Sequence, residues 1–447
     1  MRFERRGIVT IGLWYAMRLA LAERALGGRM SRPRNLFYAQ SGGVTSVINA
    51  SACGVIEAAR AHGERIGAVY AGKNGIVGAL REELIDTGKE SAADIAALRH
   101  TPGGAFGSVR YKLKGIEQSA AEYQRLIEVF RAHDIGYFVY NGGGDSMDTA
   151  NKVSQVAASM DYDLTCVGVP KTVDNDLPIT DTCPGFGSVA KYVAVSTLEA
   201  AIDVASMPQT KVFILEVMGR HAGWIAAAGA LAGKDRTQAP HMILFPEVTY
   251  DEDGFVAEVE RCVNAYGSCV VVASEGIRRA DGSFVAESGT RDAFGHAQLG
   301  GVAPALAQVV RGRLGYKFHW AVADYLQRAA RHIASAVDVE QAYAMGRAAV
   351  DLALSGVHGK LPIIVRTNDD PYTWEVGSAD LSDVANVEKT VPSEYISEDG
   401  FHITDACRTY LLPLIQGEDY PPYENGIPAY VRLGNALVDK RLPVWEG

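Results

Sequence analysis

The chain has 447 residues, of which 48% are hydrophobic and 21% are charged, and this composition excludes a disordered polypeptide. Its net charge of -10 argues against nonspecific nucleic-acid binding, which depends on cations that neutralise phosphates. None of the six cysteines forms a Cys-x-x-Cys pair, so we expect reduced, buried thiols in a cytoplasmic protein, not zinc ligands or disulfides.

The first 30 residues are expected to lie outside the folded core. Three arginines within residues 2–6 precede an apolar run over residues 7–22, a pattern that partly resembles a secretory signal. Arg18 interrupts this run, no small-residue cleavage site follows it, and it is too short to span a membrane. Met30 stands just before the first strand pattern. Our hypothesis is that residues 1–29 are absent from the native protein, which an intact-mass measurement would test.

From residue 35 onward, short apolar runs alternate with amphipathic stretches. Strands are predicted at Asn35–Gln40, Ile135–Tyr140, Leu164–Val169, Val212–Val217, Met242–Phe245 and Cys269–Ala273. Helices are predicted at about Ser46–Arg60, from Met147, and at Val189–Ala205, Phe255–Ala265 and Val337–Leu354. This alternation predicts an α/β fold whose parallel sheets are covered by helices and whose ligands bind at the carboxyl ends of the strands. The length suits two such domains or one large domain with insertions.

Two glycine-rich segments follow predicted strands. Ser41-Gly42-Gly43 precedes a helix, whose N-terminus attracts phosphate, although a tight turn without a ligand explains the glycines equally well. Asn141-Gly142-Gly143-Gly144-Asp145 ends in a carboxylate. One carboxylate is enough for a Mg²⁺ ion that also binds substrate phosphates, and a helix cap is the alternative interpretation.

The segment Pro170–Asp176 places a cation, a hydroxyl and two carboxylates directly after a strand. Asp174 and Asp176 suit a general base and its neighbour, and Lys171 suits a phosphoryl group, although a solvated turn has a similar composition. Later strand ends add an arginine that suits phosphate and a glutamate that suits a sugar hydroxyl. Together these groups predict phosphoryl transfer to a phosphorylated sugar.

At these segments the chain resembles the phosphofructokinase family. The matching segments keep the family's order over about residues 35–356: Ser41-Gly42-Gly43, Gly107-Ser108-Val109-Arg110, Gly143-Gly144-Asp145, Pro170–Asp176, Met218-Gly219-Arg220, Ser274-Glu275-Gly276 and Tyr325-Leu326-Gln327-Arg328. The resemblance implies two α/β domains, with a Mg²⁺-dependent active site in the cleft between them and at least a homodimer. We accordingly expect a donor-binding domain at residues 31–180, a sugar-phosphate-binding domain at 181–360, and a C-terminal part at 361–447 that can pack on both. From about Pro362 this last part is expected to be irregular, and no chemistry is assigned to it.

The resemblance also implies individual roles. Asp174 is expected to take the proton from the sugar's 1-hydroxyl with Asp176 beside it, and Asp145 is expected to hold Mg²⁺. Pyrophosphate is expected to bind near Gly43, Arg110 and Ser146. Fructose 6-phosphate is expected to bind Thr172, Asp174, Lys211, Met218, Gly219, Arg220, Glu275, Tyr325 and Arg328. Lys211 and His319 stand where short ATP-dependent members carry arginines that reach a neighbouring subunit, and Lys317 is a further candidate for that contact.

Two positions favour pyrophosphate over ATP as the donor. Relatives that use ATP have glycine in place of Lys171 and of Ser146, and a fixed lysine can neutralise both phosphates of pyrophosphate where an ATP α-phosphate would lie. Many pyrophosphate-dependent relatives carry a second aspartate in place of Ser146. The alternatives are an ATP-dependent member, a non-catalytic regulatory subunit, an enzyme for another sugar phosphate such as sedoheptulose 7-phosphate, and a dinucleotide-binding oxidoreductase. The last lacks its expected Gly-x-Gly-x-x-Gly segment.

Overall fold

The computed structural model of the protein describes residues 32–291 and 297–446, so the predicted N-terminal extension lies outside the described residues. Within these ranges, the larger sheet has eight strands in the order β14-β13-β6-β5-β1-β2-β3, with β4 paired to β1. These strands are β1 (Arg34–Ser41), β2 (Ile66–Gly72), β3 (Leu84–Asp86), β4 (Ser108–Val109), β5 (Ile135–Gly142), β6 (Thr165–Pro170), β13 (Lys360–Asp369) and β14 (Tyr372–Asp380). The central strands β2, β1, β5 and β6 run parallel, so their carboxyl ends share one edge.

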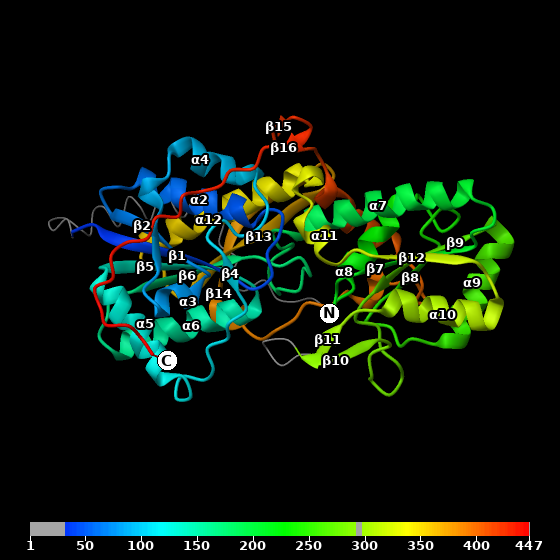
Figure 1. Ribbon diagram of the computed structural model, residues 1–447, viewed down its shortest axis with the longest axis horizontal. Coiled ribbons are helices and arrows are strands. Elements are labelled where there is room, and N and C mark those ends of the chain that lie inside the picture. Colours follow the sequence, from blue (N-terminus) through cyan, green and yellow to red (C-terminus); the bar gives the residue numbers. More distant parts are fainter. Residues whose placement is uncertain (1–31, 292–296, 447) are drawn as a thin grey trace.

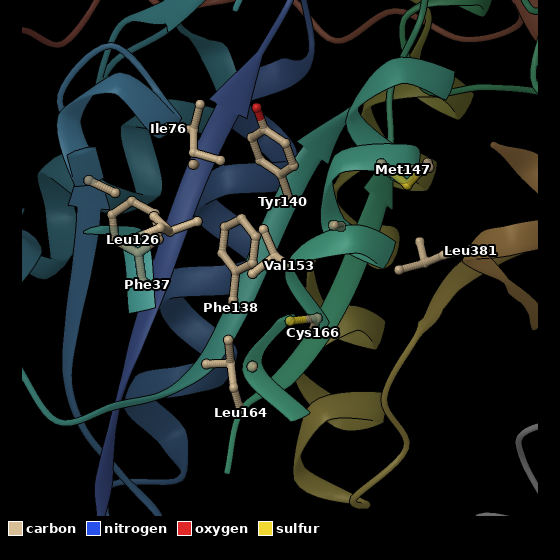
Figure 2. Close-up of a cluster of buried hydrophobic side chains, with 14 of the residues drawn as sticks. Phe37, Ile76, Leu126, Phe138, Tyr140, Met147, Val153, Leu164, Cys166 and Leu381 are labelled. Carbon is tan, nitrogen blue, oxygen red and sulfur yellow. The ribbon is translucent and has the colours of Figure 1, made fainter. Parts of the chain in front are cut away.

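Helices cover both faces of this sheet, as the alternating apolar runs predict (Figure 1). They are α2 (Ile48–Ala61), α3 (Ile76–Leu80), α4 (Ala92–Ala97), α5 (Ala120–Ala132), α6 (Gly144–Ser159) and α12 (Ala336–Leu354). Along β1, Leu36 and Tyr38 pack on the α2 and α12 side, whereas Phe37 packs on the α5 and α6 side. Figure 2 shows Phe37 beside Phe138 and Tyr140 of β5 in this second core. Both faces of β1 are therefore buried, and packing on both sides positions the end of the strand.

A smaller parallel sheet lies beside the larger one (Figure 1) and has the strand order β12-β7-β9-β8. Its strands are β7 (Val212–Val217), β8 (Met242–Leu244), β9 (Cys269–Ser274) and β12 (Phe318–Val322). Its helices are α7 (Phe186–Ser206), α8 (Trp224–Ala228), α9 (Glu252–Tyr266), α10 (Val302–Leu314) and α11 (Asp324–Ala329). α7 and α8 cover one face, and α9 and α10 cover the other. The predicted arrangement of helix-covered sheets is confirmed.

The predicted strands agree with the structure, and the helices differ mainly at their N-termini. α6, α7 and α9 begin earlier than predicted, because their first turns are polar or glycine-containing and carry no apolar periodicity: Gly144-Asp145-Ser146, Phe186-Gly187-Ser188 and Glu252-Asp253-Gly254. Among the described residues, none of the helices combines the length and the apolar character needed to cross a membrane.

The prediction of an irregular C-terminal part is wrong for its first segment. β13 and β14 form an antiparallel hairpin, and β13 extends the larger sheet beside β6. The prediction missed the alternation of Leu361, Ile363 and Val365 because Pro362 and the Asp-Asp-Pro turn dominate the local composition.

The chain then contacts both sheets. α13 (Leu381–Val384) packs near α6, and α14 (Asp405–Leu411) joins the core around α7 and α8. The last residues return to the larger sheet, where Val438 N donates to Leu84 O at 2.9 Å. Two small hairpins complete the described elements: β10 (Glu287–Arg291) with β11 (Ala297–Leu299), and β15 (Tyr423–Glu424) with β16 (Ile427–Pro428). The domain limits at residues 180 and 360 remain predictions.

Candidate functional site

One cavity of about 250 Å³ lies where loops from both sheets meet. Strands β1, β5 and β6 of the larger sheet end at its edge, as do β7 and β9 of the smaller sheet, and α11 closes one side. The residues that line it are Gly42, Gly43, Val44, Arg110, Gly143, Gly144, Asp145, Ser146, Lys171, Thr172, Val173, Asp174, Asp176, Met218, Arg220, Glu275 and Arg328. Most of the residues predicted for the site, which are far apart in sequence, therefore converge on one volume.

The loop after β1 requires glycine at two positions for different reasons. Gly42 has a φ of +74°, which L-residues with a side chain rarely adopt. A Cβ on Gly43 would lie 2.7 Å from Nη1 of Arg328 and 3.3 Å from Nη2 of Arg110. A bare backbone thus lets two guanidinium groups approach the loop, and this combination suits a multiply charged phosphate.

Lys171 connects the end of β6 to this loop. Its ammonium donates to Gly43 O at 2.7 Å, and the side chain is only 4% exposed. Burial lowers the pKa of Lys171 to about 8, with the nearby Arg110 acting in the same direction. The group therefore remains mostly protonated at pH 7 and presents a fixed positive charge to the cavity.

Asp174 and Asp176 lie on the same loop as Lys171. Asp174 N donates to Thr172 Oγ1 at 3.1 Å, which fixes the start of the turn. Burial raises the pKa of Asp174 to about 7, and the neighbouring carboxyls of Asp176 and Glu275 add to the rise. Burial also raises the pKa of Asp176, whose Oδ1 is buried without a hydrogen-bond partner. A carboxyl that titrates near neutral pH is matched to proton abstraction from a hydroxyl.

Asp145 lies in the first turn of α6, at the cavity. Its Oδ1 is 2.6 Å from Nζ of Lys112, a residue that was not predicted to belong to the site. The basic residues Arg110, Lys112 and Lys114 alternate along the sequence there, but this spacing does not indicate which carboxylate any of them approaches. The neighbouring Ser146, also predicted, is buried at 5% exposure and lines the same wall.

The smaller sheet contributes the opposite wall. Met218 N donates to Oε1 of the buried Gln327 at 3.3 Å, which ties the end of β7 to α11. Gly219 has a φ of +134° and does not itself line the cavity. Burial raises the pKa of Glu275, and a hydrogen bond from the Gly219 backbone opposes that rise. Arg220 and Arg328 bring two guanidinium groups to this wall.

Two further predicted residues do not line the cavity. Lys211 precedes β7, at the opposite end of the strand from Met218, and its Nζ donates to Gly267 O at 3.2 Å. Tyr325 is 63% exposed on α11, where its ring stacks on the Arg328 guanidinium, 3.7 Å from the ring centroid. Val44 and Val173 line the cavity and were not predicted, because single valines in a loop carry no distinctive signal.

Comparisons with known proteins agree with this geometry. The family model described as phosphofructokinase matches residues 35–370. The chain is 67% identical over 92% of its length, and 98% of the relative, to a pyrophosphate–fructose 6-phosphate 1-phosphotransferase of Methylococcus capsulatus. It is 65% identical, over 92% of its length and 99% of the relative, to the protein of the same name from Halomonas elongata. A solved pyrophosphate-dependent phosphofructokinase of Marinobacter aquaeolei superposes with a TM-score of 0.85 at 62% identity, covering 92% of this chain and 99% of the other.

Proposed function

The chain belongs to the phosphofructokinase family, and we propose that it catalyses the reversible transfer of a phosphoryl group from pyrophosphate to the 1-hydroxyl of fructose 6-phosphate. The products are fructose 1,6-bisphosphate and orthophosphate. The observation that carries the donor assignment is Lys171, a buried ammonium held between the glycine loop and the loop of Asp174. Such a reaction serves sugar breakdown and sugar synthesis, because one phosphoanhydride is exchanged for a phosphate ester without a nucleotide.

Asp174 is the general base in this proposal. Its carboxylate accepts the proton of the sugar's 1-hydroxyl, and the hydroxyl oxygen forms a bond to the terminal phosphorus of pyrophosphate as the bridging P–O bond breaks. The bridging oxygen leaves with orthophosphate. Lys171 and Arg110 face the charge that moves onto this leaving group, and a buried cation acts strongly there because little water screens it. The negative charge of Asp176 adds to the rise in the pKa of Asp174, which makes Asp174 a stronger base.

The donor set fits Mg²⁺ in a site completed by substrate. Within the described ranges, no three His, Cys, Asp or Glu side chains gather as a metal cage, so Asp145 would hold the ion together with pyrophosphate oxygens and water. The bound ion supplies neutralisation of phosphate charge. Magnesium is the appropriate hard cation for an all-oxygen site of this kind.

The opposite wall suits the sugar phosphate. Arg220 and Arg328 match a phosphate bidentately, and Glu275 can accept from a sugar hydroxyl. Thr172, Met218 and Gly219 shape the space between them, and Tyr325 supports Arg328 by stacking. These groups suit a phosphorylated sugar, and the names of the relatives support fructose 6-phosphate as the acceptor. The six cysteines are all buried and free, which supports a cytoplasmic location.

We also propose that the protein works as a homodimer or a higher homo-oligomer. The adjacent elements α7, β12 and α11 expose large apolar side chains, a feature that marks interaction surfaces. These residues, here called the apolar surface, are Leu198, Ile202, Trp320, Val322, Tyr325 and Leu326. Lys211 directly precedes β7, and His319 lies on the edge strand β12 next to Trp320. A second copy bound there can bring these basic groups, with Lys317 beside them, to the sugar phosphate of the first.

A coupled assay with fructose 6-phosphate and Mg²⁺ tests the function by comparing pyrophosphate with ATP as donor. We expect activity with pyrophosphate alone. Activity with ATP alone would remove the donor role of Lys171 and keep the Asp174 chemistry. Inactivity with both donors would contradict the proposed function and favour a regulatory subunit or another sugar phosphate.

A further inference from the structure

The C-terminal segment Glu388–Val391, here called the brace, makes contacts on both sides of the cavity. Lys389 N donates to Asp176 O at 2.6 Å, on the loop that carries the proposed base. Val391 N donates to Glu247 Oε1 at 2.8 Å, and the same oxygen accepts Gly223 N at 2.9 Å, next to the loop of Arg220. The brace therefore links the loop of Asp174 and Asp176, here called the donor wall, to the loop of Arg220, here called the sugar wall.

The side chain of Lys389 strengthens the link on the base side. An ammonium has three donors, and three oxygens of one turn surround it. Nζ donates to Asp181 O at 2.9 Å, to Thr180 O at 3.1 Å and to Asn175 Oδ1 at 3.4 Å. This turn follows the proposed base directly, so the position of one ammonium governs the path of the backbone that leaves Asp174.

The main chain of Lys389 is fixed by the sugar side of the molecule. Trp224 Nε1 donates to Lys389 O at 3.0 Å, and the ammonium lies 5.6 Å from the centre of the same indole ring. Trp224 begins α8, directly after the loop that holds Arg220. Contacts from both sides of the cavity therefore meet at Lys389.

The turn that carries the proposed base contains a residue with an uncommon backbone conformation, and side-chain contacts hold that residue. Asn175 stands between the two aspartates with a φ of +54°, in the left-handed region. Its side chain is fully buried, donating to Tyr410 OH at 2.9 Å and accepting from Cys183 N at 3.0 Å. Lys389 provides a third contact to that amide. Burial raises the pKa of Asp176, and the charge of Lys389 is among the effects that oppose it.

We propose that Lys389 is a positioning residue for phosphoryl transfer, which holds the Asp174–Asp176 turn in register with the sugar-binding loop. It touches neither substrate site and acts through Asp176, Asn175 and Trp224. The proposal rests on the proposed function, since the reaction defines the base. The proposal assigns a catalytic supporting role to the C-terminal part, for which the sequence alone indicated no role.

The test uses the full chain with Lys389→Met, which keeps the length of the side chain and removes its donors. We expect kcat to fall about 10- to 100-fold, as a base misplaced by about 1 Å would cause. KM for pyrophosphate and for fructose 6-phosphate should stay within about threefold, because the phosphate-binding groups are untouched. Lys360→Met is the matched control: Lys360 pairs with Asp380 at 2.9 Å in the same part of the chain, away from the cavity.

Assays are run well below the Tm of each variant, so that a folding defect is not counted as lost catalysis. A kcat within about twofold of the wild type would overturn the proposal, as would an equal effect in the control. Should Lys389→Met fail to fold, Lys389→Arg and Lys389→Gln decide by the same separation of kcat from KM. Failure of the proposed function would appear in the wild-type protein instead, and the comparison would then be made with whichever donor that protein uses.

Discussion

On the donor side of the cavity, every residue predicted from the sequence lines the wall: Gly43, Arg110, Asp145, Ser146, Lys171, Asp174 and Asp176. Of the residues predicted for the sugar side, Thr172, Met218, Arg220, Glu275 and Arg328 line the cavity, whereas Lys211, Gly219 and Tyr325 do not. The donor side is built from the carboxyl ends of parallel strands in one sheet, which topology alone brings together. The predicted sugar side also includes Lys211, which precedes β7 at the end of that strand away from the cavity. The apolar surface lies on the same part of the molecule. One chain thus brings all of its predicted donor-side residues to the cavity, but only some of its predicted sugar-side residues.

The largest effect should come from the group shared by both sides. Asp174→Asn keeps the size of the side chain and removes its basicity, so kcat should fall about 10²- to 10⁴-fold. Both KM values should change little, because the phosphate-binding cations remain. Steady-state kinetics with each substrate varied measures this. A decrease in kcat of less than tenfold would identify Asp176 as the base, and kinetics of Asp176→Asn would then verify that role.

The next effect separates the donor side from the sugar side. Lys171→Met removes the buried ammonium beside Gly43, and kcat/KM for pyrophosphate should fall about 10²- to 10³-fold. Equilibrium binding of fructose 6-phosphate alone, measured by calorimetry, should remain near the wild-type value. Lys152→Met is the control, because Lys152 pairs with Asp148 at 2.5 Å on α6, outside the cavity. Equal loss of binding for both substrates would mean that the two walls are not independent.

Substitutions in the apolar surface should have a smaller effect, confined to the binding of fructose 6-phosphate. Ile202→Asp and Trp320→Asp place charges in the apolar surface, so the oligomer should dissociate and KM for fructose 6-phosphate should rise about tenfold. Light scattering coupled to size exclusion, followed by kinetics at the same protein concentration, measures both. Val444→Asp is the control, since Val444 is 76% exposed on the C-terminal segment over the larger sheet. A monomeric variant with an unchanged KM would show that a second copy adds nothing to the sugar site.

The same contrast explains what the sequence could predict. Strands β1, β5 and β6 are continuous apolar runs followed at once by glycines or charged residues, so both fold and site have local signals there. The pairing of Lys112 with Asp145 and of Lys389 with the turn at Asn175 leaves no such signal. The latter joins residues separated by 214 positions, and a lysine in a polar stretch resembles any solvated lysine. Hydrophobic periodicity predicts secondary structure, but it does not predict contacts between side chains that tertiary packing brings together.

The smallest effect concerns stability, and it follows from the donor side being buried. The pKa of Asp174 is about 7 in the folded chain, above the ordinary value of 3.8. The folded state therefore binds the proton more tightly than the unfolded state, and ionisation of this carboxyl reduces stability as pH rises from about 4 to 7. Asp174→Asn removes that cost, so its Tm should exceed the wild-type Tm by about 2–4 °C at pH 7.5 and approach it near pH 4. Asp380→Asn changes a carboxyl on β14 that pairs with Lys360 of β13, and it should lack this gain. Thermal unfolding at both pH values measures this difference in Tm. If the wild-type protein is as stable as Asp174→Asn at pH 7.5, the positive charges of Lys171 and Arg110 fully offset the cost of burying the Asp174 carboxylate. The charges of the donor wall would then be balanced before any substrate binds.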